Sequence, residues 1–245
     1  MKYRLEIPQT IEQAYITRKN TNGFYLAAGT VLLIQKLENP VLIALEKIPG
    51  LDCIEQNGNE ITIGCNVTID NIDNSALIRE KAYALWQSAH NIAGPQIRNR
   101  ATIGGNIACF SPASDTVPAL MTLDASVTYY DGEFKTEKIT DLKPFENGEI
   151  IHKITIPCTG AKSVYEKVGK RNASSVSVLN MAIAKSNTVY RIAVGSAGPG
   201  VVFCTDPDKV LSLISPIDDR WGTKEYKRTV CRNLLDKLIR EVDVQ

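Results

Sequence analysis

The sequence predicts an α+β fold, in which helices and strands are mixed without the regular βαβ alternation of a doubly wound sheet. Two segments, 79–93 and 223–242, carry apolar residues at helical spacing. Two dipeptides, Asn57-Gly58 and Asp131-Gly132, are typical of tight β-hairpin turns. Apolar segments with strand-like alternation surround these turns, so both kinds of element are expected along the whole chain.

The first 70 residues predict one helix and several short strands. Residues 8–20 favour a helix, because Thr10 can cap it and Glu12 follows in its first turn. The segment 24–37 begins as a strand and breaks at Gly29, after which the apolar run 31–37 could open a second helix. Residues 40–70 alternate as short strands around the Asn57-Gly58 turn.

A central helix is predicted over 79–93, and it should end at Gly94-Pro95. Its expected buried stripe consists of Ala82, Leu85, Trp86, Ala89, Ile92 and Ala93. A strand over 149–157 ends at Pro157, and Thr159-Gly160 interrupts the pattern that follows. We therefore expect two domains, one over residues 1–158 and a smaller α+β domain over residues 162–245.

The second domain is expected to contain a sheet and a long C-terminal helix. Strands are predicted at 164–169, 176–185 and 188–195, followed by a turn at 195–200 and a helix near 207–214. The helix over 223–242 should bury a stripe formed by Tyr226, Val230, Leu234, Leu235, Leu238, Ile239 and Val242.

Composition argues against several classes of protein. The 245 residues are 44% hydrophobic and 22% charged, with a formal net charge of +1, as in an ordinary globular protein. No lysine or arginine block exceeds three residues, so neither nucleic acid nor an anionic membrane is an expected partner. The N-terminal segment is amphipathic, and we expect neither a signal peptide nor a transmembrane helix.

Metal chemistry within the chain is also not expected. The six cysteines lie far apart and form no CxxC pair, which argues against an iron–sulphur cluster or structural zinc. The chain has only two histidines, His90 and His152. We therefore predict no metal ligands, reduced thiols and a cytoplasmic location.

Two glycine-containing turns are the candidate functional elements. The segment IRNRATIGGNIACFSPASD, residues 97–115, contains Gly104 and Gly105, and AAGT at 27–30 contains Gly29. Glycine lets a ligand approach the backbone, and successive N–H groups can form an anion site. Two such turns could hold the two phosphates of a dinucleotide, although a structural corner or bulge explains a glycine pair equally well. A GxGxxG fingerprint is absent, so a Rossmann site is not expected.

The wider sequence resembles the FAD-binding medium subunit of the molybdenum hydroxylases, the family of xanthine dehydrogenase and molybdenum carbon monoxide dehydrogenase. The segment 96–127 is similar to the family pattern QIRN-x-A-T-x-G-G-N-I-x-x-x-S-P-x-x-D. LAAGTVLL at 26–33 resembles the family's L-A-G-G-T-D-L-L. Three further segments, at 63–68, 165–171 and 222–228, match in the same order. The resemblance implies a two-part FAD-binding domain followed by the smaller domain.

The resemblance also implies which residues bind FAD. The pyrophosphate would lie on backbone amides of two turns, formed by Ala27, Ala28, Gly29, Thr30, Val31 and Leu32 and by Thr102, Ile103, Gly104, Gly105 and Asn106. Ser111 and Asp115 match positions near the ribityl chain, and Ile151 and Lys167 match positions near the flavin ring. Asp115 could instead be a turn or cap residue, and Lys167 a solvated strand lysine. Arg98 and Asn99 are expected to brace the turn.

Two positions depart from the family pattern. Ala28 replaces the second glycine of the first turn, and Val31 replaces an aspartate or asparagine. If residue 28 needs a positive φ, alanine strains it by about 1–2 kcal/mol. If its backbone is ordinary, the position needs only a small side chain.

The resemblance implies an electron-transfer subunit that works with an iron–sulphur subunit and a large molybdopterin subunit. Electrons would pass from the iron–sulphur clusters to FAD and then to NAD⁺ or another acceptor. No catalytic side chain is predicted. One alternative is a bridging subunit that has lost FAD, favoured by Ala28. Another is a stand-alone FAD oxidoreductase with covalent flavin, for which Cys109 would be the attachment point.

Overall fold

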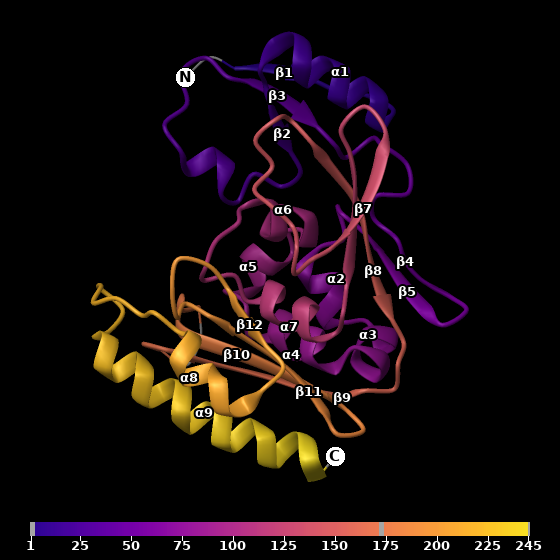
Figure 1. Ribbon diagram of the computed structural model, residues 1–245. Helices are drawn as coiled ribbons and strands as arrows, with labels where there is room; N and C mark the ends of the chain where they lie inside the picture. Colours follow the sequence, from indigo (N-terminus) through magenta and orange to yellow (C-terminus); the bar gives the residue numbers. More distant parts are fainter. Residues whose placement is uncertain (1–2, 172–173, 245) are drawn as a thin grey trace.

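A computed structural model describes residues 3–171 and 174–244, and three sheets within these ranges organise the fold (Figure 1). The first sheet is parallel, with strand order β1-β3-β2. Its strands are β1 (Arg4–Glu6), β2 (Phe24–Leu26) and β3 (Val41–Ala44), and helix α1 (Ile11–Thr21) connects the first two. The α1 helix begins as predicted, because the Thr10 Oγ1 accepts a hydrogen bond from the Gln13 N–H over 3.2 Å.

The second sheet is antiparallel, with strand order β4-β5-β8-β6-β7. Its strands are β4 (Ile54–Asn57), β5 (Glu60–Gly64), β6 (Ser126–Tyr130), β7 (Phe134–Lys138) and β8 (Ile150–Pro157). Both predicted hairpin turns are confirmed: Gly58 has φ +60° and Gly132 has φ +118°, conformations that glycine adopts without strain. The strands of the first two sheets lie between Arg4 and Pro157, within the range expected for the first domain.

Short helices pack against the second sheet. The prediction of a single helix over 79–93 is wrong, because two helices occupy this range. The helices are α2 (Ile69–Asp73), α3 (Ala76–Lys81), α4 (Tyr83–Asn91), α5 (Pro95–Arg98), α6 (Ile103–Ala108) and α7 (Thr116–Thr122). Ala82 separates α3 from α4 with φ −137° and ψ 54°. The reason is a tertiary contact, since the Ser163 Oγ accepts from the Ala84 N–H over 3.1 Å and fixes the start of α4.

The third sheet is antiparallel, with strand order β12-β11-β10-β9. Its strands are β9 (Lys162–Gly169), β10 (Ser177–Ser186), β11 (Val189–Gly195) and β12 (Val202–Cys204). A short 3-10 turn η2 (Pro207–Lys209) leads into α8 (Val210–Leu213), and α9 (Lys224–Val244) forms the predicted C-terminal helix. Figure 1 shows α9 along one face of this sheet and α4 and α7 on the other side.

The apolar stripe of α9 is confirmed at five of its seven predicted residues, whereas Ile239 is only partly buried and Tyr226 is exposed. Val230, Leu234, Leu235, Leu238 and Val242 are buried, but Tyr226 is 48% exposed. Lys227 is buried in its place, and its Nζ donates to the Asp219 Oδ2 over 2.6 Å and to the Ile217 carbonyl oxygen over 3.1 Å. Apolar periodicity does not predict a lysine that is buried because its charge is paired.

The third sheet is joined to the rest of the chain by its packing. Tyr165 of β9 and Ala182 of β10 belong to the same apolar core as α4 and the second sheet. The opposite face of the sheet forms a second core with α8 and α9. Strand β8 ends at Pro157 and β9 begins at Lys162, where the sequence predicted a boundary between two domains.

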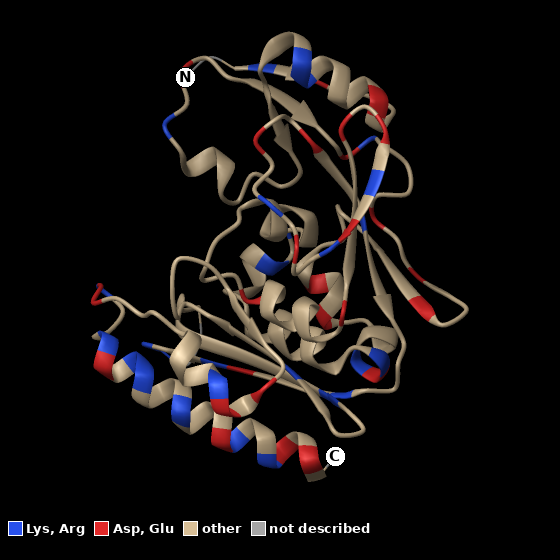
Figure 2. Ribbon diagram, viewed as in Figure 1, with Lys and Arg blue, Asp and Glu red and all other residues tan. Residues whose placement is uncertain are grey.

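The surface carries both signs of charge. Figure 2 shows acidic and basic residues interspersed along α9 and over the loops of the first two sheets. In the described ranges, no helix combines the length and the apolar character that a membrane crossing requires. The same residues contain no group of three or more histidine, cysteine or carboxylate side chains that could hold a metal ion.

Candidate cofactor-binding site

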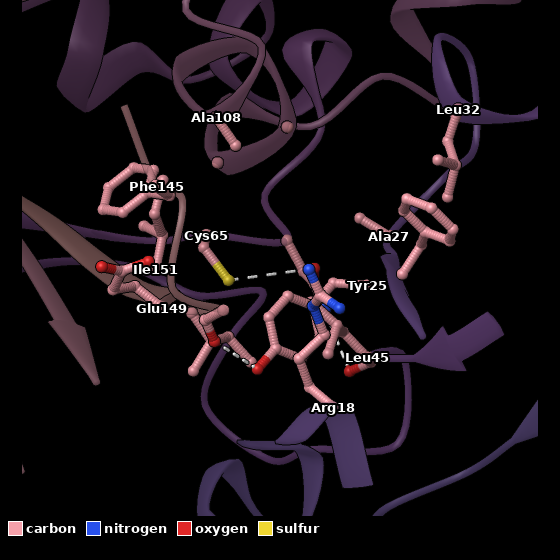
Figure 3. A pocket seen from close by; sticks show the side chains of 16 residues that line it. Arg18, Tyr25, Ala27, Leu32, Leu45, Cys65, Ala108, Phe145, Glu149 and Ile151 are labelled. Carbon is pink, nitrogen blue, oxygen red and sulfur yellow. Dashed lines mark hydrogen bonds between the residues drawn. The ribbon is translucent and has the colours of Figure 1, made fainter. Parts of the chain in front are cut away.

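A cleft of about 230 Å³ lies between the first sheet, α6 and the segment that leads into β8. Figure 3 shows Phe145, Glu149 and Ile151 on one side, Ala27 and Leu32 on the other, and Ala108 of α6 above them. The residues that line it are Arg18, Phe24, Tyr25, Ala27, Leu32, Leu45, Cys65, Asn66, Gly104, Gly105, Ala108, Phe145, Gly148, Glu149, Ile150 and Ile151. Five predicted site residues therefore meet at one cleft: Ala27, Leu32, Gly104, Gly105 and Ile151.

The first predicted turn presents free backbone donors. Residues 27–31 lie outside helices and strands, and among the described residues no acceptor is bonded to their N–H groups. Gly29 has φ +74°, and its carbonyl oxygen accepts from the Leu33 N–H over 3.0 Å. This bond closes the turn that precedes the 3-10 helix η1 (Leu32–Ile34). A run of unpaired amides beside a cleft suits an anion such as a pyrophosphate.

Ala28 is compatible with this turn. It is not among the residues with positive φ, so alanine adds no left-handed strain there. Of the two interpretations of position 28, the ordinary backbone is the one observed. The apolar run 31–37 forms only the η1 turn rather than a helix, and Ile34 in it is 81% exposed.

The second predicted turn differs from the expectation. Gly104 and Gly105 lie in the first turn of α6, not in a strand-to-turn break, and every N–H from 103 to 106 already has an acceptor. The Gly104 N–H donates to the Cys65 carbonyl oxygen over 2.9 Å, and the Gly105 N–H donates to the Thr102 Oγ1 over 3.1 Å. Ile103 donates to the Val67 oxygen and Asn106 to the Thr102 oxygen. In this structure these amides brace α6 and are not free to bind phosphate.

Gly104 and Gly105 have different structural roles. A Cβ on Gly104 would lie 2.6 Å from the Cys65 Cβ and 2.7 Å from the Cys65 carbonyl oxygen, so this position needs glycine for packing. A Cβ on Gly105 would meet only the Thr102 Oγ1, at 3.0 Å, and Gly105 is exposed at the cleft. Gly105 therefore leaves room on the cleft wall for a ligand.

Polar side chains after α6 tie this segment together. The Asn106 Oδ1 accepts from the Ser114 Oγ and from the Thr116 Oγ1, each over 2.5 Å. The Ser111 Oγ accepts from the Ala113 N–H over 3.2 Å. These bonds fix residues 111–116, and the Asn106 and Ser111 side chains support the loop from inside. The Arg98 guanidinium donates to the His90 and Ile92 carbonyl oxygens at the end of α4, and not to the turn that it was expected to brace.

The lower wall of the cleft is aromatic and half-buried. The Tyr25 hydroxyl donates to the Gly148 carbonyl oxygen over 2.8 Å and joins β2 to the loop before β8. Burial raises the pKa of Tyr25 well above its usual range, so the phenol remains a donor. Burial also raises the pKa of the Cys65 thiol to about 12, so this sulphur is protonated at neutral pH.

Asp115 and Lys167 meet away from this lining. The Lys167 Nζ lies 3.1 Å from the Asp115 Oδ2, and the two side chains are 10% and 12% exposed. The Asp115 Oδ1 accepts from the Tyr165 hydroxyl and the Ser177 Oγ, each over 2.6 Å, and from the Asn180 Nδ2 over 3.0 Å. Lys167 is therefore not a solvated strand lysine, and the Asp115 side chain does not cap α7. Sequence reasoning missed Tyr165, Ser177 and Asn180, because no local pattern marks a contact 50 or more residues away.

The other residues predicted for the site lie in the turn at 27–31 or in and next to α6. Thr30 and Val31 lie in the free-amide turn with Ala28 and Gly29, and Ile103 is buried below Gly104. Thr102 caps α6. Cys109 is exposed just after α6 and is not part of the cleft lining, which gives no support to a covalent flavin at this position.

A cleft beside a run of unpaired backbone amides is the kind of site that suits a protein with a nucleotide cofactor. The family described as "FAD binding domain in molybdopterin dehydrogenase" matches residues 1–159. The chain belongs to this family. This match confirms the predicted family. It also confirms FAD as the cofactor and the assignment as an oxidoreductase subunit.

Curated relatives agree with this assignment. The chain is 33% identical to the nicotinate dehydrogenase FAD-subunit of Eubacterium barkeri, over 72% of this chain and 66%, just under two thirds, of that subunit. It is 25% identical to the carbon monoxide dehydrogenase medium chain of Hydrogenophaga pseudoflava, over 97% of this chain and 96% of that chain.

Solved structures show the same fold. A chain of carbon monoxide dehydrogenase from Hydrogenophaga pseudoflava superposes with a TM-score of 0.90 at 20% identity, covering 98% of this chain and 96% of that one. A chain of quinoline 2-oxidoreductase from Pseudomonas putida 86 gives a TM-score of 0.88 at 16% identity, covering 99% and 97%. The expected α+β fold is confirmed.

Proposed function

We propose that this chain is the FAD-binding electron-transfer subunit of a multi-subunit molybdenum hydroxylase. It would take electrons from the iron–sulphur clusters of one partner subunit and pass them through FAD to NAD⁺ or another acceptor. The observation that carries this proposal is the turn at 27–31, whose unpaired N–H groups adjoin the cleft. Membership of the FAD-binding family supplies the identity of the anion.

The residues present fit a dinucleotide cofactor at the first turn. The amides from Ala27 to Leu32 would hold the pyrophosphate, with Gly29 supplying the left-handed turn that aims them. Gly105 would admit the cofactor along α6, and Ile151 would pack against it in the cleft. As the resemblance implies, Asp115 would lie near the ribityl chain and Lys167 near the flavin ring. Thr102, Gly104, Asn106 and Ser111 would shape the site from behind.

The chemistry of the subunit comes from the cofactor. Bound flavin can accept electrons singly and release them in pairs, which suits a junction between iron–sulphur clusters and a two-electron acceptor. The side chains of this chain bind, orient and shield the cofactor, and we assign none of them a catalytic proton transfer. The clusters and the molybdenum site would belong to an iron–sulphur subunit and a large molybdopterin subunit. A cytoplasmic location is part of the same proposal.

The test is the flavin content of the purified chain. Oxidised flavin gives the protein visible absorbance, and acid or heat should release one FAD per chain into the supernatant. A colourless, well-folded chain that binds no added FAD would favour a bridging subunit that has lost its cofactor. Flavin that stays with the precipitate would indicate covalent attachment instead.

The partners are tested by co-purification from the native source. We expect a stable complex that contains an iron–sulphur subunit and a large molybdenum subunit. Substrate-dependent reduction of NAD⁺ by the isolated chain at the full rate would contradict this, because the chain would then need neither partner.

A further inference from the structure

Arg18 is the single cation that the described residues contribute to the lining of the cleft. It lies in the last turn of α1 and is half-buried. The same lining holds one carboxylate, Glu149, whose Oε2 accepts from the Asn147 N–H over 2.8 Å and whose Oε1 accepts from the Asn147 Nδ2 over 3.4 Å. Because Glu149 is bonded within its own loop, its charge is not paired with that of Arg18.

Three neighbours hold the Arg18 side chain in place. Its Nη1 donates to the Asn22 Oδ1 over 2.7 Å, and its Cζ lies 5.8 Å from the centre of the Phe24 ring, within the range of a cation–π contact. A Cβ on Gly148 would lie 3.0 Å from the Arg18 Cγ, so the glycine leaves room for the aliphatic part of the arginine. The charge therefore has a defined position in the wall of the cleft.

The guanidinium keeps donors for a ligand. It has five N–H groups, and the bond to Asn22 is the only hydrogen bond that it donates within the described ranges. A planar guanidinium can bind two oxygens of one phosphate group. The free amides at 27–31 border the same cleft, because Ala27 also lines it. Figure 3 shows Arg18 and Tyr25 in the lower part of the view, with Ala108 of α6 in the upper part.

We propose that Arg18 binds the pyrophosphate of the cofactor together with the amides of the turn at 27–31. This inference rests on the proposed FAD function. The pyrophosphate is doubly anionic at neutral pH, whereas backbone amides donate hydrogen bonds without a net charge. Residues 27–31 contain no lysine or arginine, so Arg18 supplies the positive charge that the turn lacks. An attraction between charges at a partly open cleft weakens as salt screens it.

The experiment measures the dissociation constant of FAD for the full chain at about 50 mM and about 500 mM salt. The neutral variants are Arg18→Met and Arg18→Gln, and Arg18→Lys keeps the charge. The matched control is Lys19→Met, which removes a positive charge from the neighbouring residue of α1. The Lys19 Nζ lies 5.7 Å from the centre of the Tyr15 ring, and Lys19 does not line the cleft. Circular dichroism and thermal melting establish that each variant is folded.

We expect each neutral variant to weaken FAD binding by roughly ten- to a hundredfold at low salt, the effect of losing a hydrogen bond between charged groups. The loss should become smaller at high salt. Arg18→Lys should keep most of the wild-type affinity, and Lys19→Met should keep all of it.

Three results would overturn the inference. The neutral variants could fold and bind FAD as tightly as the wild-type chain. Their loss could be the same at both salt concentrations and equal to that of Arg18→Lys, which would indicate that Arg18 only packs against Phe24 and caps α1. Lys19→Met could lose as much affinity as Arg18→Met, which would indicate a general effect of net charge. If the wild-type chain itself binds no FAD, the proposed function fails and the inference fails with it.

Discussion

Gly104 lies directly against Cys65, with its N–H bonded to the Cys65 carbonyl oxygen and no room for a Cβ between the two residues. We predict that Gly104→Ala lowers the free energy of unfolding by about 1–3 kcal/mol through overpacking. Gly105→Ala should leave stability nearer the wild-type value, because Gly105 is exposed and its Cβ would meet only the Thr102 Oγ1, at 3.0 Å, but should weaken FAD binding. Thermal melting and FAD titration of both variants check this. Equal losses of stability would contradict the division of roles.

A second prediction concerns Gly29 in the turn at 27–31. Gly29 has φ +74°, and a Cβ there would lie 2.5 Å from the Leu33 Cδ1. Gly29→Ala should therefore cost about 1–2 kcal/mol in backbone strain, with repacking of Leu33 in addition, and should displace the free amides. We expect a large loss of FAD affinity. Ala28→Gly is the control, and since Ala28 has no positive φ it should change FAD affinity little.

Breaking the Asp115–Lys167 pair should be costly. Asp115→Asn leaves the ammonium without its charged partner in a buried site, and we expect a loss of about 3–5 kcal/mol in the free energy of unfolding. The double variant Asp115→Asn with Lys167→Met removes both charges, so it should be less destabilised than the sum of the two single variants. Urea unfolding of the four proteins measures this coupling. Additive effects would show that the two charges do not interact.

Titration of His152 should make the free energy of unfolding depend on pH. Its ring packs on Phe134, with 5.1 Å between the ring centroids, and burial lowers its pKa. Below the ordinary histidine pKa of about 6.5, the unfolded chain binds a proton that the folded chain does not yet bind. The free energy of unfolding should therefore fall as the pH drops through this value. His152→Phe should reduce the difference in stability between pH 7.5 and pH 5.5, and an unchanged difference would refute the assignment.

Local patterns predicted the elements that depend on local chemistry. The cap at Thr10, the turns at Gly58 and Gly132 and the long C-terminal helix all follow from nearby residues, and each is observed. The break at Ala82 was not predictable, because its cause is the Ser163 hydroxyl on another element. The burial of Lys227 was not predictable for a similar reason, because its partner Asp219 lies in the preceding loop.

The candidate site was predictable in part. The segments around Gly29 and Gly104 do meet at one cleft, as expected. The roles of the amides around Gly104 were not predictable, since their acceptors Cys65 and Val67 come from a different part of the sequence. The hydrogen bonds to Asp115 likewise depend on strand register, which places Asn180 opposite Lys167 on neighbouring strands.

The shared core of Tyr165 and Ala182 has a consequence for the integrity of the protein. One face of the third sheet is covered by α9, but the other face is covered by α4 and α7 from before residue 158. A chain severed between Pro157 and Lys162 would expose apolar surface on both fragments. We therefore expect a single cooperative melting transition for the intact chain. A protease nick in this loop should leave the two fragments associated until denaturant separates them.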